Sequence, residues 1–277
     1  MNASAKLFSA VILSYNSARY IKHCLNTLAA AFSAFAEPCE IWVVDNGSSD
    51  GSVKLIAEAA ALYAGVVRPI FLPVNTGTTV SRNQALRAAE GRYVLVLDSD
   101  ATITSDALAK LRALLEREPD VGIAVPRLTY PDGRFQISTD QFPTVTRKLQ
   151  RLMNLKSMEE TAVAPDASCN VDYAISACWL LRRELLEVVG LLDENIFYSP
   201  EDVDYCVRVW LAGYRIVYEP AATVIHDAQE LSRGKKIGKF KLKHAEGLGY
   251  YFRKHGYCFS LGGLYRRIAK VAPSHAG

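Results

Sequence analysis

The chain has 277 residues, of which 50% are hydrophobic and 22% are charged, and its formal net charge is +3. This hydrophobic share supports a buried core and excludes an intrinsically disordered chain, and the length fits one large α/β domain with a small appendage. The net charge is too small for a typical nucleic-acid-binding protein, in which basic residues dominate one face, so we expect no nucleic acid partner.

The first 126 residues alternate between short apolar runs and segments of helical length. The runs are rich in β-branched and aliphatic residues, as in strands buried on both faces, and lie at 7–13, 40–44, 66–72, 93–97 and 121–125. Helices are expected at 18–36, 51–64, 80–89 and 107–118, with Asp50 and Ser105 as N-caps. This alternation predicts right-handed β-α-β units on a mainly parallel sheet flanked by helices.

The pattern changes after residue 126. The turn sequence Pro131-Asp132-Gly133 predicts a hairpin between 128–130 and 134–137, and residues 138–170 predict a long, partly helical excursion. Further strands are expected at 171–175, 178–181, 214–218 and 222–225, and further helices at 183–189 and 202–212. The helix over 202–212 has a core-facing stripe at helical spacing, and Gly213 is placed to end it.

The C-terminal segment is basic. Residues 233–243 contain Arg233, Lys235, Lys236, Lys239, Lys241 and Lys243 and no acidic residue. A loose helical stripe follows, formed by Ile237, Phe240, His244, Leu248 and Tyr251 and weakened by Gly247 and Gly249. The pattern predicts a small helical extension over 227–277, which either docks on the rest of the chain or contacts an anionic membrane surface through 233–255.

The cysteines and the apolar runs indicate the compartment. The six cysteines are scattered without a C-x-x-C pair, as in a protein with reduced thiols. No apolar run is long enough to cross a bilayer, and 7–13 runs into Ser14-Tyr15-Asn16 without a signal-peptide cleavage site. We therefore expect a cytoplasmic protein, with any membrane contact peripheral to the inner face.

Polar residues follow successive predicted strands, at 14–16, 45–50, 75–77 and 98–100. In open α/β sheets, ligands bind at the carboxyl ends of the strands. Each cluster alone also fits a turn or a helix cap, since the same residue types serve there. Together, they predict a polar binding edge.

Asp98-Ser99-Asp100 is the most informative of these clusters. Asp98 and Asp100 are two residues apart at a strand end, so their side chains are expected on the same side. Paired carboxylates suit a hard divalent cation, Mn²⁺ or Mg²⁺, which fills its shell with substrate phosphates. Such a cation would offset the charge of a departing diphosphate.

Other candidate residues lie farther along the chain. Asp202 and Glu201 begin a predicted helix, where acids either stabilise the helix dipole or serve as a general base. His226 ends a strand and can complete a metal shell, although a lone histidine is more often structural. Arg82 and Asn83 open a helix, where an arginine either binds phosphate or is solvated.

Taken together, these segments resemble the family 2 glycosyltransferases of the GT-A fold. The similarity runs from residue 8 to residue 226 and is nearest to bacterial rhamnosyltransferase-like members that build surface polysaccharides. The matching segments, in the family's order, are VILSYN (11–16), VVDNGSSDGS (43–52), NTGTTVSRNQAL (75–86), GRYVLVLDSDATI (91–103), CWLLRRELLEVVGLLDE (178–194) and SPEDVDYCVRVWLAGYRIVYEPAATVIH (199–226).

The resemblance implies a role for each matching residue. A nucleotide donor, a UDP- or dTDP-sugar, would contact Ser14, Tyr15, Asn16, Asp45, Arg82, Asn83, Asp98 and Ser99. Asp100 would be the main metal ligand, with Asp98 and His226 as further ligands. Asp202, with Glu201 beside it, would be the base that activates a hydroxyl of a glycan or lipid-linked acceptor, in a displacement that inverts the anomeric centre.

The resemblance also implies an organisation of the chain. Residues 1–226 would form a GT-A catalytic domain, with a nucleotide-binding half over 1–126 and an acceptor-binding half over 127–226. The chain lacks the Q-x-x-R-W signature of processive synthases, so we expect transfer of one or a few sugars.

Two alternatives remain at this point. A sugar-nucleotide pyrophosphorylase shares the strand-helix opening, but needs a glycine-rich basic loop where this chain has Ser14–Arg19. A non-catalytic nucleotide-sugar binder would have no need of both Asp98-Ser99-Asp100 and Glu201-Asp202.

Overall fold

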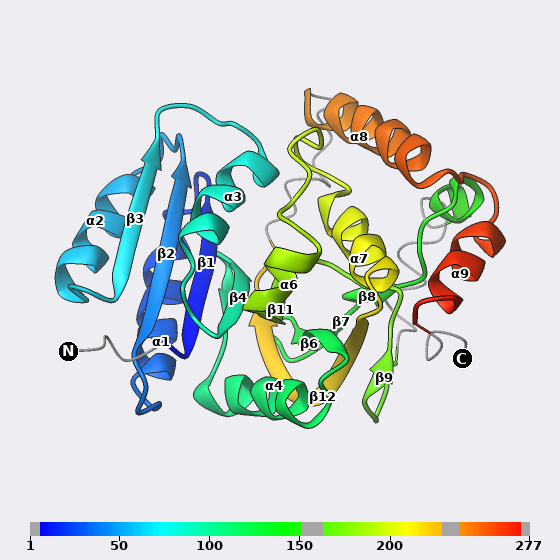
Figure 1. Ribbon diagram of the computed structural model, residues 1–277. Coiled ribbons are helices and arrows are strands. Elements are labelled where there is room, and N and C mark those ends of the chain that lie inside the picture. The colour runs from blue at the N-terminus through cyan, green and yellow to red at the C-terminus, as the bar shows by residue number, and fades with distance from the viewer. Residues whose placement is uncertain (1–5, 151–162, 229–238, 273–277) are drawn as a thin grey trace.

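A computed structural model describes residues 6–150, 163–228 and 239–272 (Figure 1). A ten-stranded sheet runs through the molecule in the order β3-β2-β1-β4-β11-β6-β12-β5, with β7 added to β6 and β9 to β12. The strands of this sheet are β1 (Phe8–Ser14), β2 (Cys39–Asn46), β3 (Val67–Leu72), β4 (Tyr93–Asp98), β5 (Ala101–Thr102), β6 (Val121–Thr129), β7 (Phe135–Gln136), β9 (Cys169–Asn170), β11 (Cys178–Arg182) and β12 (Arg215–His226). A separate pair joins β8 (Thr139–Asp140) to β10 (Tyr173–Ala174).

The sheet is mixed. β3, β2, β1 and β4 are parallel, β11 lies antiparallel between β4 and β6, and β6 and β12 are parallel. The helices are α1 (Ile21–Phe32), α2 (Ser52–Leu62), α3 (Thr78–Ala88), α4 (Ser105–Arg117), α6 (Arg183–Val188), α7 (Glu201–Leu211), α8 (Lys239–His255) and α9 (Gly262–Ala269). This architecture confirms the predicted, mainly parallel sheet flanked by helices.

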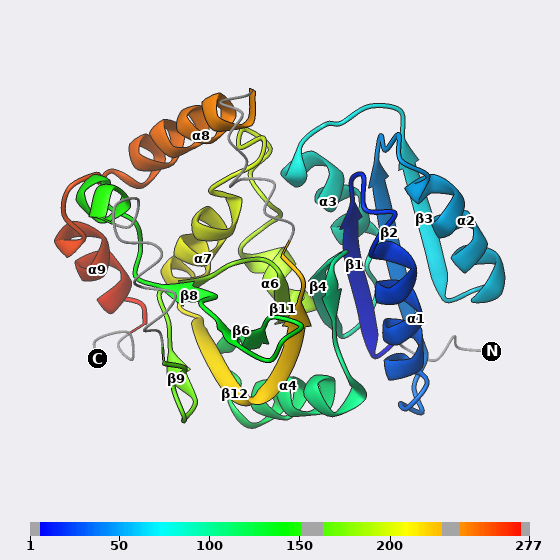
Figure 2. The ribbon, with the colours of Figure 1, turned by 180° about the vertical axis from the view of Figure 1, so that it is seen from behind.

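Two apolar cores lie on the two faces of the sheet. The residues of α1, α2 and α4 contribute to one core, and those of α3, α7 and α9 contribute to the other. Figures 1 and 2 show the same division, with α1 and α3 on opposite faces of the parallel strands. Strands such as β1, which is buried along most of its length, are apolar throughout because both faces are covered.

Most predicted elements are confirmed, but several details were wrong. The strands expected at 121–125 and 128–130 are one strand, β6. The N-cap of α4 is Thr104, whose side chain accepts a bond from Ala107 N–H at 3.2 Å, and that of α2 is Gly51 rather than Asp50. The two strands expected at 214–218 and 222–225 are one strand, β12, with a register shift between Glu219 and Thr223. The polar and proline residues at that shift resemble a turn in sequence, whereas here they bend a continuous strand.

The helix predicted over 202–212 ends as expected. Gly213 follows α7 with φ of 87°, a left-handed conformation that glycine adopts without strain. Of the predicted stripe, Val203, Cys206, Val207 and Trp210 are buried. The excursion over 138–170 contains β8 and β9, and its residues 151–162 lie outside the described ranges.

A loop before α7 is tied to the amino-terminal end of α3. Thr78 N–H donates to Phe197 O at 2.7 Å, and Thr79 Oγ1 donates to Ile196 O at 2.7 Å. A Cβ on Gly77 would lie 2.3 Å from Phe197 O, so only glycine allows this approach. The contact joins the parallel half of the sheet to the segment that precedes Glu201.

Within the described ranges, no helix combines the length and the apolar content that a bilayer crossing would need.

Candidate active site

Three adjacent strands bring their terminal polar residues into one row. Ser14 at the end of β1 pairs with Asp45 of β2, and the preceding residue of β1, Leu13, pairs with Asp98 of β4. The predicted nucleotide-binding residues and the predicted metal ligands therefore share one edge of the sheet, where open α/β folds bind ligands.

The β1 and β2 ends form a hydrogen-bonded corner. Asp45 is fully buried, and its carboxylate accepts bonds from Ser48 N–H at 2.9 Å and Ser48 Oγ at 2.6 Å. Ser14 Oγ lies 3.3 Å from Asp45 Oδ2, and Asn16 N–H donates to Ser48 Oγ at 2.9 Å. Asn16 has φ of 49°, a left-handed conformation that asparagine adopts more readily than most residues. Tyr15, beside it, is half-buried at the same edge.

Asp98, Asp100 and His226 form a cluster at the end of β4. One ligand atom of each lies within 4.8 Å of the others. His226 reaches the cluster because it pairs with Ala101 of β5, directly after Asp100, and its Nε2 lies 3.3 Å from Asp100 Oδ1. Its Nδ1 lies 2.8 Å from Gln136 Oε1, to which it donates. That bond leaves Nε2 aimed at the carboxylates, as in histidines that bind metals.

The electrostatics of this cluster fit a cation. Burial lowers the pKa of His226, but the hydrogen bond to Asp100 and the charges of Asp98 and Asp100 outweigh it and raise the pKa above its usual value. Burial also raises the pKa of Asp98, an effect that Arg82 opposes and Asp100 strengthens. Two carboxylates and an imidazole nitrogen thus converge on a point where a positive charge is favoured. This set of donor atoms suits Mn²⁺, and it also suits Mg²⁺ when that ion keeps more of its bound waters.

Arg82 connects this cluster to the start of α7. Its guanidinium, 3% exposed, forms an ion pair with Asp98 Oδ1 and donates to Ser176 Oγ at 2.6 Å. The same guanidinium lies 3.9 Å from Glu201 Oε1. Arg82 is therefore a buried bridge between two carboxylates, rather than a solvated residue on a helix face.

Glu201 and Asp202 lie in the first turn of α7. Burial raises the pKa of Glu201 well above its usual value, and the neighbouring charge of Asp202 adds to the effect. Burial also raises the pKa of Asp202, while the N–H of Val203 and the charge of Lys148 oppose the rise. The side chain of Glu201 is buried, whereas Asp202 is partly exposed at the start of the helix.

Asn83 and Ser99, both predicted to contact the nucleotide, have side chains that lie within the protein. The side chain of Asn83 is held by the loop before α7, donating to Leu192 O and Glu194 Oε1, both at 2.9 Å, and accepting from Leu192 N–H. The structure therefore does not bring its amide to the cluster around Asp98. Ser99 is buried between the two aspartates, at the turn that follows β4.

No sequence pattern indicated several residues that act on these groups. Gln136 orients His226, and Ser176 binds Arg82, across separations of 90 and 94 residues. Lys148 lies near enough to Asp202 for its charge to lower the pKa of that carboxyl. The pKa of His244 is lowered by burial and, in addition, by the charge of Lys148. Uncharged or surface-type residues such as these become recognisable only once the fold places them.

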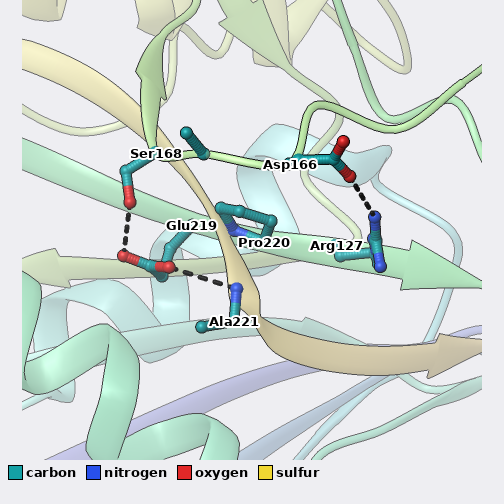
Figure 3. A pocket seen from close by; sticks show the side chains of 7 residues that line it. Arg127, Asp166, Ser168, Glu219, Pro220 and Ala221 are labelled. Carbon is teal, nitrogen blue, oxygen red and sulfur yellow. Dashed lines mark hydrogen bonds and ion pairs between the residues drawn. The ribbon is translucent and has the colours of Figure 1, made fainter.

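A separate hollow of about 300 Å³ lies beside the register shift of β12 (Figure 3). It is lined by Arg127, Asp166, Ala167, Ser168, Glu219, Pro220 and Ala221, none of which belongs to the candidate site. Glu219 accepts bonds from Ser168 Oγ at 2.8 Å and Ala221 N–H at 3.1 Å. Its carboxylate is thus used within the wall of the hollow.

Comparison with known sequences extends the resemblance. The profile of glycosyl transferase family 2 matches residues 9–190. An uncharacterized protein of Mycobacterium bovis is 33% identical over 128 residues, covering 45% of this chain and 36% of its own length. The succinoglycan biosynthesis protein ExoO of Rhizobium meliloti is 29% identical over 86% of this chain and 64% of its own. An N-acetylglucosaminyl-diphospho-decaprenol L-rhamnosyltransferase of Mycobacterium tuberculosis is 27% identical over 74% and 71%.

Solved structures confirm the fold. The mannosyltransferase PcManGT of Pyrobaculum calidifontis, in complex with GDP-Man and Mn²⁺, has a TM-score of 0.61 at 19% identity, covering 98% of this chain and 70% of that one. TarS of S. aureus, residues 1–349 in complex with UDP-GlcNAc, has a TM-score of 0.63 at 20% identity, covering 96% and 71%. The sheet is that of the GT-A glycosyltransferases, and with more than half of its length matched by the family profile, the chain belongs to glycosyl transferase family 2.

Proposed function

We propose that this chain is an inverting glycosyltransferase that moves a sugar from a nucleotide-diphosphate donor to a hydroxyl of a glycan or lipid-linked acceptor. The observation that carries the proposal is the connection of two sites by Arg82. On one side of it lies the Asp98-Asp100-His226 cluster, and on the other lies the Glu201-Asp202 pair. A donor site and a base adjoin in this way when a leaving group and an attacking hydroxyl must meet at one carbon.

The donor side is assigned to the half of the chain over 1–126. Ser14, Tyr15, Asn16 and Asp45 would contact the base and ribose of a UDP- or dTDP-sugar, at the same edge as Asp98. Asp100, Asp98 and His226 would hold Mn²⁺ or Mg²⁺. When bound, the cation would offset the negative charge that develops on the departing diphosphate.

The acceptor side is assigned to the half over 127–226. Asp202, half-buried at the start of α7, would take the proton of the acceptor hydroxyl as its oxygen attacks. Glu201, beside it, faces Arg82 and would hold that guanidinium toward Asp98. Burial of both carboxyls favours proton uptake, since it raises the pKa of Asp202 toward the range of an efficient base.

The named relatives support the choice of substrates. PcManGT and TarS are described with GDP-Man and UDP-GlcNAc, which supports a nucleotide sugar as donor. ExoO is named for succinoglycan biosynthesis, and the mycobacterial rhamnosyltransferase for a diphospho-decaprenol acceptor. Both names support a glycan or lipid-linked acceptor.

A thermal-shift screen tests the donor site. UDP, dTDP, GDP and ADP, each with Mn²⁺, Mg²⁺ or EDTA, are compared at about 100 times the dissociation constant, where one nucleotide is expected to raise the Tm by about 5–10 °C. The rise is expected only with the cation. A Tm that no nucleotide changes, or one that rises equally in EDTA, contradicts the proposed site. Release of nucleoside diphosphate from the matching nucleotide sugar then identifies a transferase, whereas formation of nucleoside triphosphate and sugar 1-phosphate from the nucleotide sugar and added pyrophosphate would identify a nucleotidyltransferase.

We also propose that the protein acts at the cytoplasmic face of the membrane, through the basic segment 233–255. Among the described residues of α8, Lys243 and Arg253 are exposed, and Leu242 is 63% exposed. Each basic residue near an anionic leaflet contributes about 1 kcal/mol. The protein is expected to float with phosphatidylglycerol vesicles at low salt and to be released at high salt. Recovery in the soluble fraction at low salt would remove this proposal.

A further inference from the structure

The first turn of α7, which carries Glu201 and Asp202, has no side-chain cap. Its N-cap is Pro200, which offers no capping side chain, and the first regular bond runs from Asp204 N–H to Pro200 O at 3.0 Å. Within the turn, Val203 N–H donates to Asp202 Oδ1 at 2.8 Å, and helix ends without an N-cap side chain tend to fray. The position of Asp202 therefore also depends on what packs against this turn from outside.

Helix α8 packs against this turn (Figure 1). A Cβ on Gly247 would lie 2.3 Å from Ser199 O and 3.5 Å from Pro200 Cδ. The backbone of α8 therefore touches the two residues before α7, and only glycine permits that contact. The residue that weakens the helix in sequence is the one that allows it to dock.

The carboxyl-terminal half of α8 also binds the start of α7 and the loop before it. It does so through a cluster of side chains that we call the α8 clamp, formed by Asp193, Asp204, Tyr250, Lys254 and His255. Lys254 Nζ lies 2.7 Å from Asp193 Oδ2 and 2.6 Å from Asp204 Oδ1. His255 Nε2 lies 2.8 Å from Asp204 Oδ1, and Tyr250 OH donates to Asp193 Oδ2 at 2.9 Å. The clamp thus joins α8 both to the loop before α7 and to the first turn of α7.

Asp204 is held by several partners. Its side chain is fully buried, and Arg208, one turn along α7, is a further cationic partner at 2.9 Å. A buried carboxylate is tolerated only when paired, so loss of Lys254 is expected to weaken the docking of α8 while Arg208 still pairs with Asp204. This pairing lies close to the proposed base, because Asp204 is two residues from Asp202 on the same helix.

We propose that the α8 clamp is a positioning device for Asp202, fixing the first turn of α7 so that the base faces the acceptor. The inference rests on the proposed role of Asp202. The hydrogen bonds and ion pairs of the clamp run to Asp193 and Asp204, so the clamp would act on Asp202 through the backbone of α7. Helix α8 is then part of the catalytic unit and not only an appendage.

Lys254→Met tests the clamp, with Lys110→Met as the matched control. Lys110 lies on α4, whose buried residues belong to the other apolar core, and it pairs at the surface with Asp106 at 2.6 Å. Hydrogen exchange of the amides at 201–206 is expected to become faster in Lys254→Met alone. With the nucleotide sugar that gives the highest turnover in a panel of UDP-, dTDP- and GDP-sugars, its kcat is expected to fall about 10–100-fold. The donor KM should stay within about twofold, because the donor half is unchanged.

Lys254→Arg should restore most of the kcat, since it keeps the cation at this position. If Lys254→Met does not fold, Tyr250→Phe, which removes one hydroxyl, is measured in the same way and should show a smaller change of the same kind. Wild-type exchange at 201–206 together with wild-type kcat in the variant overturns the proposal. So does a loss of donor binding equal to the loss of kcat, which indicates general destabilisation. Retained transfer by Asp202→Asn would instead remove the role of Asp202, so the two failures are distinguishable.

Discussion

Asp202→Asn is expected to remove most sugar transfer, lowering kcat by about 10²–10⁴-fold, which is the usual contribution of a general base. The amide has the shape of the carboxyl group and can still accept the bond from Val203 N–H, which is 2.8 Å from Oδ1. It cannot take up the proton of the acceptor hydroxyl. Donor binding should persist, because the residues that would hold the nucleotide lie on β1, β2 and β4. The measurement is kcat at saturating donor, together with nucleotide affinity by calorimetry.

Asp106→Asn is the matched control for this change. Asp106 is the second residue of α4, as Asp202 is of α7, and it pairs at the surface with Lys110. An acid at a helix start contributes about 0.3–1 kcal/mol through the helix dipole, so both variants lose a similar structural term. Only Asp202→Asn should lose activity. Substantial transfer by Asp202→Asn, or an equal loss in both variants, would exclude Asp202 as the base.

The pH profile gives the same prediction a second readout. Burial raises the pKa of Asp202, so the acidic limb of the kcat profile should lie above the value of about 3.9 that is usual for aspartate. The base acts when ionised, and activity is therefore present above the raised pKa and lost as the pH falls through it. The residual activity of Asp202→Asn should lack this limb.

The convergence of polar residues at one edge of the sheet was predictable, because strand ends in a parallel sheet lie together. The apolar runs located β1, β2 and β4, and the register of these strands then places Asp45 and Asp98 in one row. That convergence follows from the right-handed β-α-β connections, which alternating patterns already indicate. The binding of a donor and of a cation by these residues stays a prediction.

The part of the site that depends on tertiary contacts was not predictable from local patterns. His226 reaches Asp100 through β5, a strand of two residues that has no periodic signal. Arg82 follows a helical pattern that fits a solvated residue equally well. Only the fold, in which α3 packs on β1 and β2, places its guanidinium between Asp98 and Glu201. Gly247 illustrates the opposite error, since helix propensity counts it as a weakness and the close approach of Ser199 requires it.

Asp100→Ala is expected to remove the cation dependence of nucleotide binding and to lower kcat/KM by about 10²–10⁴-fold, since a metal that stabilises a leaving diphosphate contributes several kcal/mol. Asp100 is the better choice than Asp98 for this test. Asp98 is also the partner of Arg82, which is 3% exposed, so its removal would strand a buried guanidinium and perturb Glu201. Replacement of Asp100 leaves that ion pair in place.

The measurement compares UDP affinity with Mn²⁺ and with EDTA in the wild type, in Asp100→Ala and in Asp132→Ala. Asp132 is an exposed aspartate whose ion pair with Arg134 is local to the turn before β7, so its variant should behave as the wild type. In Asp100→Ala the two affinities should become nearly equal, while affinity in EDTA matches the wild type because Ser14 and Asp45 are untouched. An undiminished effect of Mn²⁺ in Asp100→Ala would show that the cation binds elsewhere. The cluster of Asp98, Asp100 and His226 would then hold only a proton, as the raised pKa of His226 allows.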